Sequence, residues 1–205
     1  MNVVVVAKTK MGQNICVGAV DVESGALLRL IPRDGAEYHS WQEFKADIGD
    51  LITVNGSKAS TVDPPHVEDY LVSSWKPTGK SGKNLHAWIR KHCVVWNGDR
   101  SNLFDGKLRF TSYGKGHVDR GDPLPTHSVG FWELPAPLEL EPGEKKRYVM
   151  NGLLPVSAPF VGLEAPPTKC PKGAIVRVSL SRWWAPDDSD MPEACWLQIS
   201  GVYPA

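Results

Sequence analysis

Three apolar runs stand close together at the start of the chain: VVVVA at 3–7, ICVGAVD at 15–21 and ALLRLI at 26–31. Each run is short and rich in β-branched or aliphatic residues, which favours strands over long helices. The second and third runs are joined by VESG at 22–25, whose glycine suits the positive φ of a hairpin turn. A fourth run, at 50–54, ends at Asn55-Gly56. This spacing predicts a small β-barrel over residues 1–75.

Two short helices are expected among these strands. Ser40 followed by Glu43 matches a capping box, so a helical turn is predicted over residues 40–44. A second helix is predicted over residues 85–92, where Leu85, Trp88 and Ile89 share one face. Ser81 or Asn84 is its expected N-cap.

The last third of the chain returns to β-patterns. Apolar runs lie at 129–134, 147–150, 153–156, 174–180 and 195–203. Asn151-Gly152, between two of them, is a strong hairpin signal. Residues 174–180 alternate between apolar and polar side chains, which predicts one buried face and one polar face. A second barrel is therefore expected over residues 129–205.

The overall composition excludes several classes of protein. Hydrophobic residues make up 41% of the 205 residues, which is enough for a core and rules out global disorder. The 19 glycines and 17 prolines predict many turns and argue against a long helical bundle. No apolar run approaches the roughly 20 residues that span a bilayer, and the first residues lack the charged region of a signal peptide. With four widely spaced cysteines, the chain is expected to be cytoplasmic, with reduced thiols and no membrane partner.

Charge is unevenly distributed although the net charge is zero. Residues 76–120 carry 10 basic and 3 acidic side chains, whereas residues 1–75 and 121–205 are both net acidic. We interpret residues 76–128 as a basic insert or linker that contains the short helix and binds a polyanion. A solvated connector between two acidic domains is the alternative interpretation.

Aromatic residues supply a second binding signal. The chain has eight tryptophans, and Trp183 and Trp184 are consecutive after Arg182. In an extended chain they point to opposite faces, so one of them is expected to be exposed as a platform for stacking bases. The alternative is that one indole plugs the barrel end and the other packs on the insert.

No catalytic motif is evident. Asp187, Asp188 and Asp190 form a carboxylate cluster of the kind that binds Mg²⁺ in nucleases, but acidic residues after a proline are usually a solvated loop. The histidines and cysteines lack the short-range pairs of a zinc site. We therefore expect no enzyme activity, no cofactor and no metal site.

Several segments at both ends of the chain resemble the dual OB-fold-containing domain family of prokaryotes. They are residues 7–21 and 24–31, then 65–69, 147–152, 176–181 and 195–199. The resemblance implies two OB-type barrels in one chain, a presumed role in nucleic-acid recognition, no known catalysis and frequent encoding in bacterial conflict or defence neighbourhoods. It carries over no established binding residues.

The sequence thus predicts an all-β protein with two small OB-like barrels joined by a basic, partly helical insert. Its expected function is non-enzymatic binding of single-stranded DNA or RNA in a bacterial defence system. The alternatives are an adaptor for an effector protein encoded nearby and a metal-dependent nuclease. The candidate nucleic-acid-binding residues are Lys80, Lys83, Arg90, Lys91, Lys115, Arg182, Trp183 and Trp184, with secondary phosphate contacts from Lys8, Lys10, Arg29 and Arg33.

Overall fold

The predicted N-terminal strands are present and close into a barrel. The computed structural model describes residues 1–33, 41–80, 84–143, 146–185 and 192–205. The barrel has the order β1-β2-β3-β5-β4, in which β4 returns to pair with β1. Its strands are β1 (Asn2–Met11), β2 (Asn14–Asp21), β3 (Leu27–Pro32), β4 (Asp50–Lys58) and β5 (Asp69–Lys80). All pairs are antiparallel except β3–β5, which is parallel.

Two expectations for this half of the chain are wrong. Residues 76–80, expected in a flexible basic loop, are the end of β5 and pair with the start of β4. Residues 41–44 are not helical; Trp41 instead forms a two-way backbone bridge with Ile15. The buried side chain of Phe44 packs in the barrel core beside Trp41 and Trp75, and this burial outweighs a capping signal only one turn long.

The C-terminal half consists of two sheets around a shared core. The larger sheet has the order β6 (Val95–Trp96), β9 (Val129–Glu133), β14 (Ile175–Leu180), β15 (Ala194–Tyr203), β8 (Gly116–Asp119) and β7 (Arg109–Phe110). The smaller sheet has the order β12 (Val156–Pro159), β11 (Arg147–Met150), β10 (Leu138–Leu140) and β13 (Lys169–Cys170). Trp132, Tyr148 and Leu138, all fully buried, occupy the core between them. Strands β11 and β12 form the hairpin expected around Asn151-Gly152, but its turn spans residues 151–155, so residues 153–155, expected in the second strand, lie in the turn.

Residues 76–128 do not stand apart as an insert. After β5 the chain forms α1 (Leu85–His92) and then enters the larger C-terminal sheet through β6, β7 and β8, with a 3-10 helix (Arg100–Gly106) between β6 and β7. The helix has the predicted bounds, and the Asn84 side chain caps it by accepting from the Ala87 N–H at 2.9 Å. The basic segment is therefore divided between the two halves, because its short strands complete sheets whose other strands come from distant sequence.

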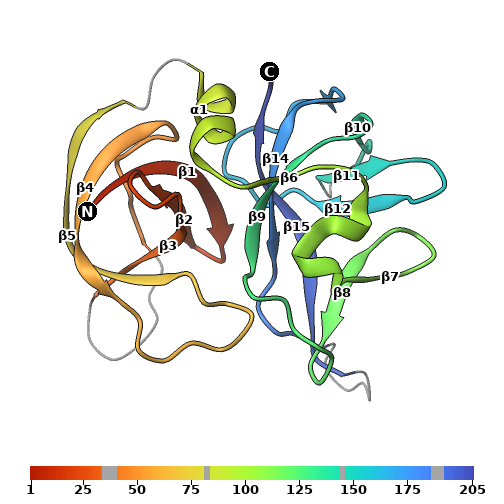
Figure 1. The fold of residues 1–205 in the computed structure, drawn as a ribbon, viewed down its shortest axis with the longest axis horizontal. Coiled ribbons are helices and arrows are strands. Elements are labelled where there is room, and N and C mark those ends of the chain that lie inside the picture. Colours follow the sequence, from red (N-terminus) through yellow and green to blue (C-terminus); the bar gives the residue numbers. More distant parts are fainter. Residues whose placement is uncertain (34–40, 81–83, 144–145, 186–191) are drawn as a thin grey trace.

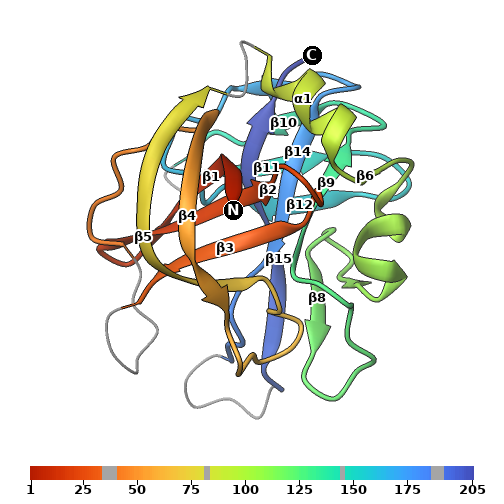
Figure 2. The same ribbon diagram turned by 60° about the vertical axis from the view of Figure 1, so that its left-hand side comes forward.

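The two halves pack directly against each other, as Figures 1 and 2 show. Their shared core includes Val4 and Val6 of β1, Ile89 of α1, and Phe131 and Ile175 of the C-terminal sheet. The end of β1 also pairs with the segment after β12, through a Thr9–Gly162 bridge. Strand β14 is consequently buried on both faces, so the predicted polar face of residues 174–180 is not exposed to solvent.

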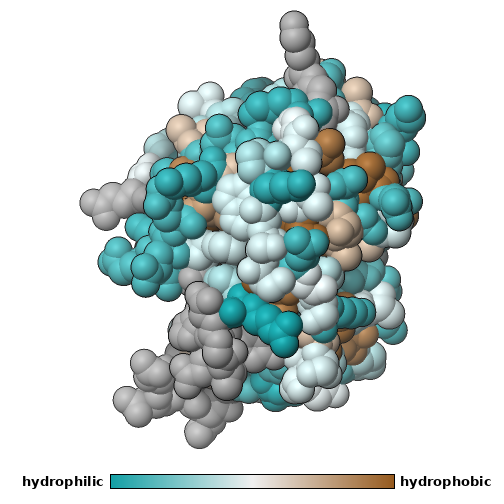
Figure 3. Space-filling view, turned by 90° about the vertical axis from the view of Figure 1, so that its left-hand side faces the viewer, coloured by the Kyte–Doolittle hydropathy of each residue, from teal (hydrophilic) through white to brown (hydrophobic). Residues whose placement is uncertain are grey.

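The outer face of the N-terminal barrel is polar. Figure 3, which views that side, shows mainly hydrophilic and neutral residues with small hydrophobic patches among them. The exposed residues of β4 and β5 include Asn55, Lys58, Ser74 and Lys76. In the part of the chain that the structure describes, no helix is both long and apolar enough to cross a membrane.

All four cysteines are free thiols, as the sequence predicts. Cys170 and Cys195 are fully buried in the C-terminal half. Burial raises the pKa of Cys195 to about 12, so this thiol is protonated at neutral pH. Its neighbour His66, whose Nε2 lies 3.6 Å from the sulfur, does not activate it as a nucleophile.

Candidate functional site

A cavity of about 200 Å³ with several charged residues in its lining lies between the two halves, where the β1–β2 hairpin and β3 face β14 and β15. We call it the inter-barrel cleft. Its lining residues are Thr9, Lys10, Met11, Cys16, Arg29, His66, Glu68, Ser128, Val129, Val161, Arg177, Ser179, Leu180, Ser181, Arg182 and Gln198. Since both halves contribute side chains, neither half forms the cleft by itself.

One wall of the cleft contains a buried ion pair. Arg29 on β3 binds the Asp69 carboxylate on β5 with two nitrogens, Nη2 donating to Oδ2 at 2.6 Å. The parallel pairing of β3 with β5 sets these residues side by side. Burial opposes the charge on Arg29, but the hydrogen bonds and charge of Asp69 outweigh it and raise the pKa of the guanidinium. The charge of Arg29 is therefore compensated within the N-terminal barrel.

A buried carboxylate joins the two halves beside this pair. Glu68 accepts the backbone N–H of Ser128 at 2.6 Å on one oxygen and the Ser128 hydroxyl at 2.7 Å on the other. Both residues are buried. Charge-assisted hydrogen bonds of this length are strong, so this link holds the halves in register at the cleft.

Arg177 occupies the middle of β14 and is only 5% exposed. Its Nη1 donates to the Ser200 hydroxyl at 2.7 Å. The guanidinium lies directly on Gly18 of β2, where a Cβ would be 2.8 Å from Nη2. Only glycine at this position leaves room for the arginine to lie against the backbone of the opposite barrel.

Two consecutive indoles follow the cleft at the end of β14. Trp183 donates its ring N–H to the Pro64 carbonyl at 3.0 Å, and the Arg120 guanidinium stacks 4.5 Å from its ring centroid. Trp184 is 55% exposed, and its backbone pairs with Ala194 at the start of β15. The backbone bridge orients Trp184 while leaving much of its side chain in solvent.

His66 also lines the cleft, and its side chain is almost fully buried, with 2% exposed. Burial, together with the positive charges of Arg29 and Arg182, lowers the pKa of His66 to about 4. This histidine is therefore neutral at pH 7.

The model of the dual OB-containing domain family matches residues 1–202. The chain belongs to this family. No curated protein and no solved structure matches the chain. The closed five-stranded barrel and the curled C-terminal sheets agree with this assignment, and the predictions of family and fold class are confirmed. Membership of the dual OB-containing domain family indicates a binding module built on OB folds.

In this dual OB-containing domain, five of the predicted site residues gather at the cleft. Lys10, Arg29 and Arg182 line it, and Trp183 and Trp184 adjoin it in the chain. Two other predicted contacts do not lie there: Lys8 is bound to the carbonyls of Phe44 and Ala46, and Arg33 is exposed at the end of β3. Lys83 lies outside the described residues.

The remaining predicted cations lie elsewhere. Lys80 pairs with Asp50 at the end of β5, and Arg90 on α1 pairs with Glu133 at 2.8 Å. Lys91 is exposed on the same helix, and Lys115 is exposed in the turn between β7 and β8. Helix α1 and Trp184 lie at opposite ends of β15. The start of the helix shares a cavity with Tyr203, the last residue of this strand, whereas Trp184 pairs with Ala194, its first residue. A ten-residue strand is roughly 30 Å long, so the helix and the indole are far apart. Lys80, Arg90, Lys91 and Lys115 therefore do not line the cleft beside Trp184.

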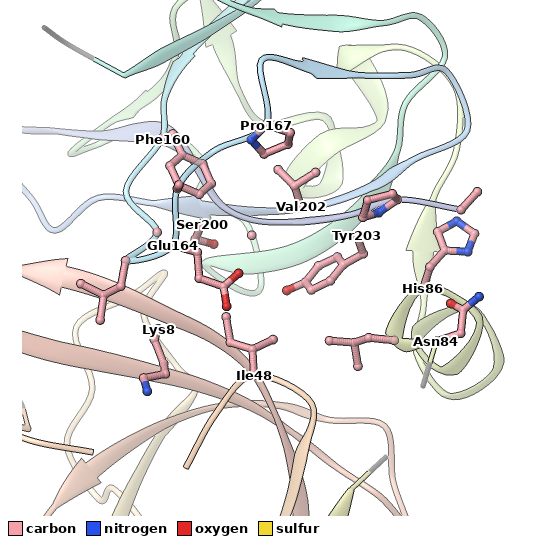
Figure 4. Close-up of a pocket in the computed structure, with 17 residues that line it drawn as sticks. Lys8, Ile48, Asn84, His86, Phe160, Glu164, Pro167, Ser200, Val202 and Tyr203 are labelled. Carbon is pink, nitrogen blue, oxygen red and sulfur yellow. The ribbon is translucent and has the colours of Figure 1, made fainter. Parts of the chain in front are cut away.

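Two further cavities lie along the interface. One, of about 430 Å³, contains Lys8, His86, Glu164 and Tyr203 (Figure 4). The Tyr203 hydroxyl already donates to the Val6 carbonyl, and His86 Nε2 lies 3.2 Å from the Gly173 carbonyl, so both serve the packing. The other, of about 480 Å³, is mostly apolar and is lined by Trp96, whose ring stacks on His127 and lies over Gly130.

Sequence reasoning did not single out the buried charged and polar residues of the cleft. Glu68, Ser128 and Arg177 come from three distant segments. Glu68 and Arg177 fall within segments 65–69 and 176–181, which resemble the family, but that resemblance assigns them no role. A signal was present at Arg177, the one charged residue of its predicted strand. No group of three or more metal-ligating side chains occurs in the described ranges, and Asp187, Asp188 and Asp190 lie outside them.

Proposed function

We propose that this protein binds single-stranded nucleic acid across the mouth of the inter-barrel cleft, without catalysing a reaction, as part of a bacterial defence or conflict system. The observation that carries the proposal is the exposed indole of Trp184, fixed by backbone pairing beside a cleft bordered by Lys10 and Arg182. Single-strand binders combine such a stacking surface with cations that follow the phosphates. The defence setting is supported by the family resemblance alone.

Replacing Trp184 with alanine is expected to weaken binding of short single strands about 5- to 150-fold. A stacked base contributes roughly 1–3 kcal/mol to binding, and the exposed indole contributes little to the core. Fluorescence anisotropy with labelled DNA and RNA strands measures the change. Tyr113→Ala is the matched control, because Tyr113 is an exposed aromatic beyond the far end of β8. Unchanged affinity in the Trp184 variant contradicts the proposal.

Salt dependence tests which cations contact the strand. We expect log K to fall linearly with log salt, and Lys10→Gln to make the slope shallower by about 0.7, the value for one phosphate of a single strand. Lys115→Gln removes a similarly exposed charge from the β7–β8 turn and is expected to leave the slope unchanged. The opposite result would place the strand on the basic segment instead of the cleft.

An adaptor function is the second candidate, and one surface favours it. Leu153 is 97% exposed and Tyr113 is 80% exposed, on turns that touch where Gly114 meets Pro155. Exposed apolar side chains on neighbouring turns are typical of protein contacts. Loss of partner binding in a Leu153→Asp variant, together with no shift on adding oligonucleotides, would support the adaptor function over nucleic-acid binding.

A further inference from the structure

Arg177 is a buried cation that forms no ion pair among the described residues, although the Glu68 carboxylate lies near enough to favour its charge. Its Nε has no hydrogen-bond partner among these residues either. Its one side-chain hydrogen bond to another residue is the neutral contact of Nη1 with Ser200. Burial lowers the pKa of the guanidinium, yet an arginine keeps its proton in proteins. Arg177 therefore places a positive charge at the depth of the cleft, with the Glu68 carboxylate as its acidic neighbour.

The neighbouring acidic groups are already engaged. Asp69 is bound by both nitrogens of the Arg29 fork, and Glu68 uses both oxygens on Ser128. Nη1 of Arg177 faces Ser200, Nη2 packs against Gly18 and Nε is buried, so both halves of the protein hold the guanidinium in place. Arg177 nevertheless lines the cleft. The part of its side chain that borders the cavity brings a positive charge within reach of a phosphate or carboxylate.

The size and charge of the cleft limit its ligand. Its volume of about 200 Å³ is below the range of roughly 300–1,000 Å³ typical of sites that enclose a whole drug-sized ligand. Its lining has four basic side chains, those of Lys10, Arg29, Arg177 and Arg182, against one carboxylate, that of Glu68, so a small anionic group fits best. A phosphate monoester carries nearly two charges at pH 7, more than the single charge of a phosphodiester.

We propose that the inter-barrel cleft receives a phosphate monoester, with Arg177 as its deepest contact and Lys10 and Arg182 at the rim. On the proposed function, this group is the terminal phosphate of a single strand whose first bases reach Trp184. The backbone of a strand interior continues on both sides of each phosphate and does not enter so small a cavity. The cleft thereby gives the protein a preference for phosphorylated strand ends.

The preference is measured with three otherwise identical short strands that carry a 5′-phosphate, a 3′-phosphate or hydroxyls at both ends. We expect one phosphorylated strand to bind about 10- to 100-fold more tightly than the hydroxyl strand, the range for a hydrogen-bonded contact to a charged group. Arg177→Gln is expected to remove this ratio, and Arg177→Lys to restore part of it. Lys115→Gln is the control and keeps the wild-type ratio.

Two further variants keep the test decisive if substitutions at Arg177 impair folding. Lys10→Gln changes an exposed rim residue, and Gly18→Ala places a Cβ 2.8 Å from Nη2 and displaces the guanidinium without removing it. Both are expected to reduce the ratio in protein whose thermal unfolding shows a folded state. Equal affinity of wild-type protein for all three strands, with no shift in melting temperature on adding inorganic phosphate, overturns the proposal.

Inorganic phosphate separates this inference from the proposed function. If phosphate raises the melting temperature of the wild type but not of Arg177→Gln, and no strand binds, the phosphate site stands and the ligand is a small phosphorylated molecule. That result rejects strand binding. If strands bind through Trp184 irrespective of their ends, strand binding stands and the phosphate site is rejected.

Discussion

Replacing Asp69 with alanine is expected to lower the free energy of unfolding by about 3–5 kcal/mol, the usual loss when one partner of a buried ion pair is removed. The Asp69 side chain is 2% exposed and the Arg29 side chain 16%, so the arginine left behind would be a buried charge without its partner. Urea unfolding followed by circular dichroism measures the change. The exposed pair of Lys169 and Glu139, 3.0 Å apart and 59% exposed on both sides, is the control. Glu139→Ala is expected to cost less than about 1 kcal/mol.

A double replacement separates the cost of an unpaired charge from the contribution of the pair itself. Arg29→Met combined with Asp69→Leu removes both charges, and we expect it to recover most of the stability that Asp69→Ala loses. If the double variant is no more stable than Asp69→Ala, the loss comes from packing and not from the unpaired arginine. The affinity of the same double variant for single-stranded nucleic acid shows whether Arg29 also contacts the bound strand.

Lowering the pH from about 6.5 to about 4 is expected to cost about 3 kcal/mol of stability through His66 alone. The folded-state pKa of His66 is about 4, below its ordinary value of 6.5, because the ring is buried and faces Arg29 and Arg182. Between these two values the unfolded chain binds a proton that the folded chain does not bind. The stabilisation is thus complete above pH 6.5 and is lost progressively as the pH falls towards 4, by about 1.4 kcal/mol for each unit of pKa difference.

The measurement is the free energy of unfolding at a series of pH values in that window. His66→Gln removes the titrating group but keeps a polar side chain, so its stability curve is expected to be flatter than that of the wild type. Parallel curves for the two proteins would show that His66 does not titrate as its surroundings require. The charges of Arg29 and Arg182, which add to the effect of burial on His66, also favour an anion in the cleft.

Local sequence patterns were sufficient to predict a helix or strand where residues close in the sequence stabilise it. Residues 85–92 form the helix that their spacing predicts, since Asn84 caps it and Ile89 anchors its apolar face. The strands at 15–21 and 26–31 follow equally from β-branched and aliphatic runs and a glycine turn. In contrast, charge suggested a loop at 76–80, where pairing with β4 makes a strand.

The candidate site, too, was predictable from the sequence only in part. An exposed indole was predictable from two consecutive tryptophans, because they point to opposite sides of an extended chain, and Trp184 is the exposed one. The grouping of basic residues was not predictable, since counting charges along a segment says nothing about which strand ends meet. Lys80 and Lys115 both belong to the basic segment of the sequence, but they lie in different parts of the fold. Lys80 is in β5 of the barrel, and Lys115 is in the turn before β8 of the C-terminal sheet.

By itself, the sequence determined the β-rich class, the two halves and the residues that form most strands, because periodicity and turn residues act over a few positions. The tertiary structure alone decided that β14 is buried on both faces and that Arg177 lies on Gly18, some 160 residues earlier in the chain. Burial and compensation of charge depend on what the opposite barrel places there. That placement follows from the packing of the closed N-terminal barrel against the C-terminal sheets, and no local pattern encodes it.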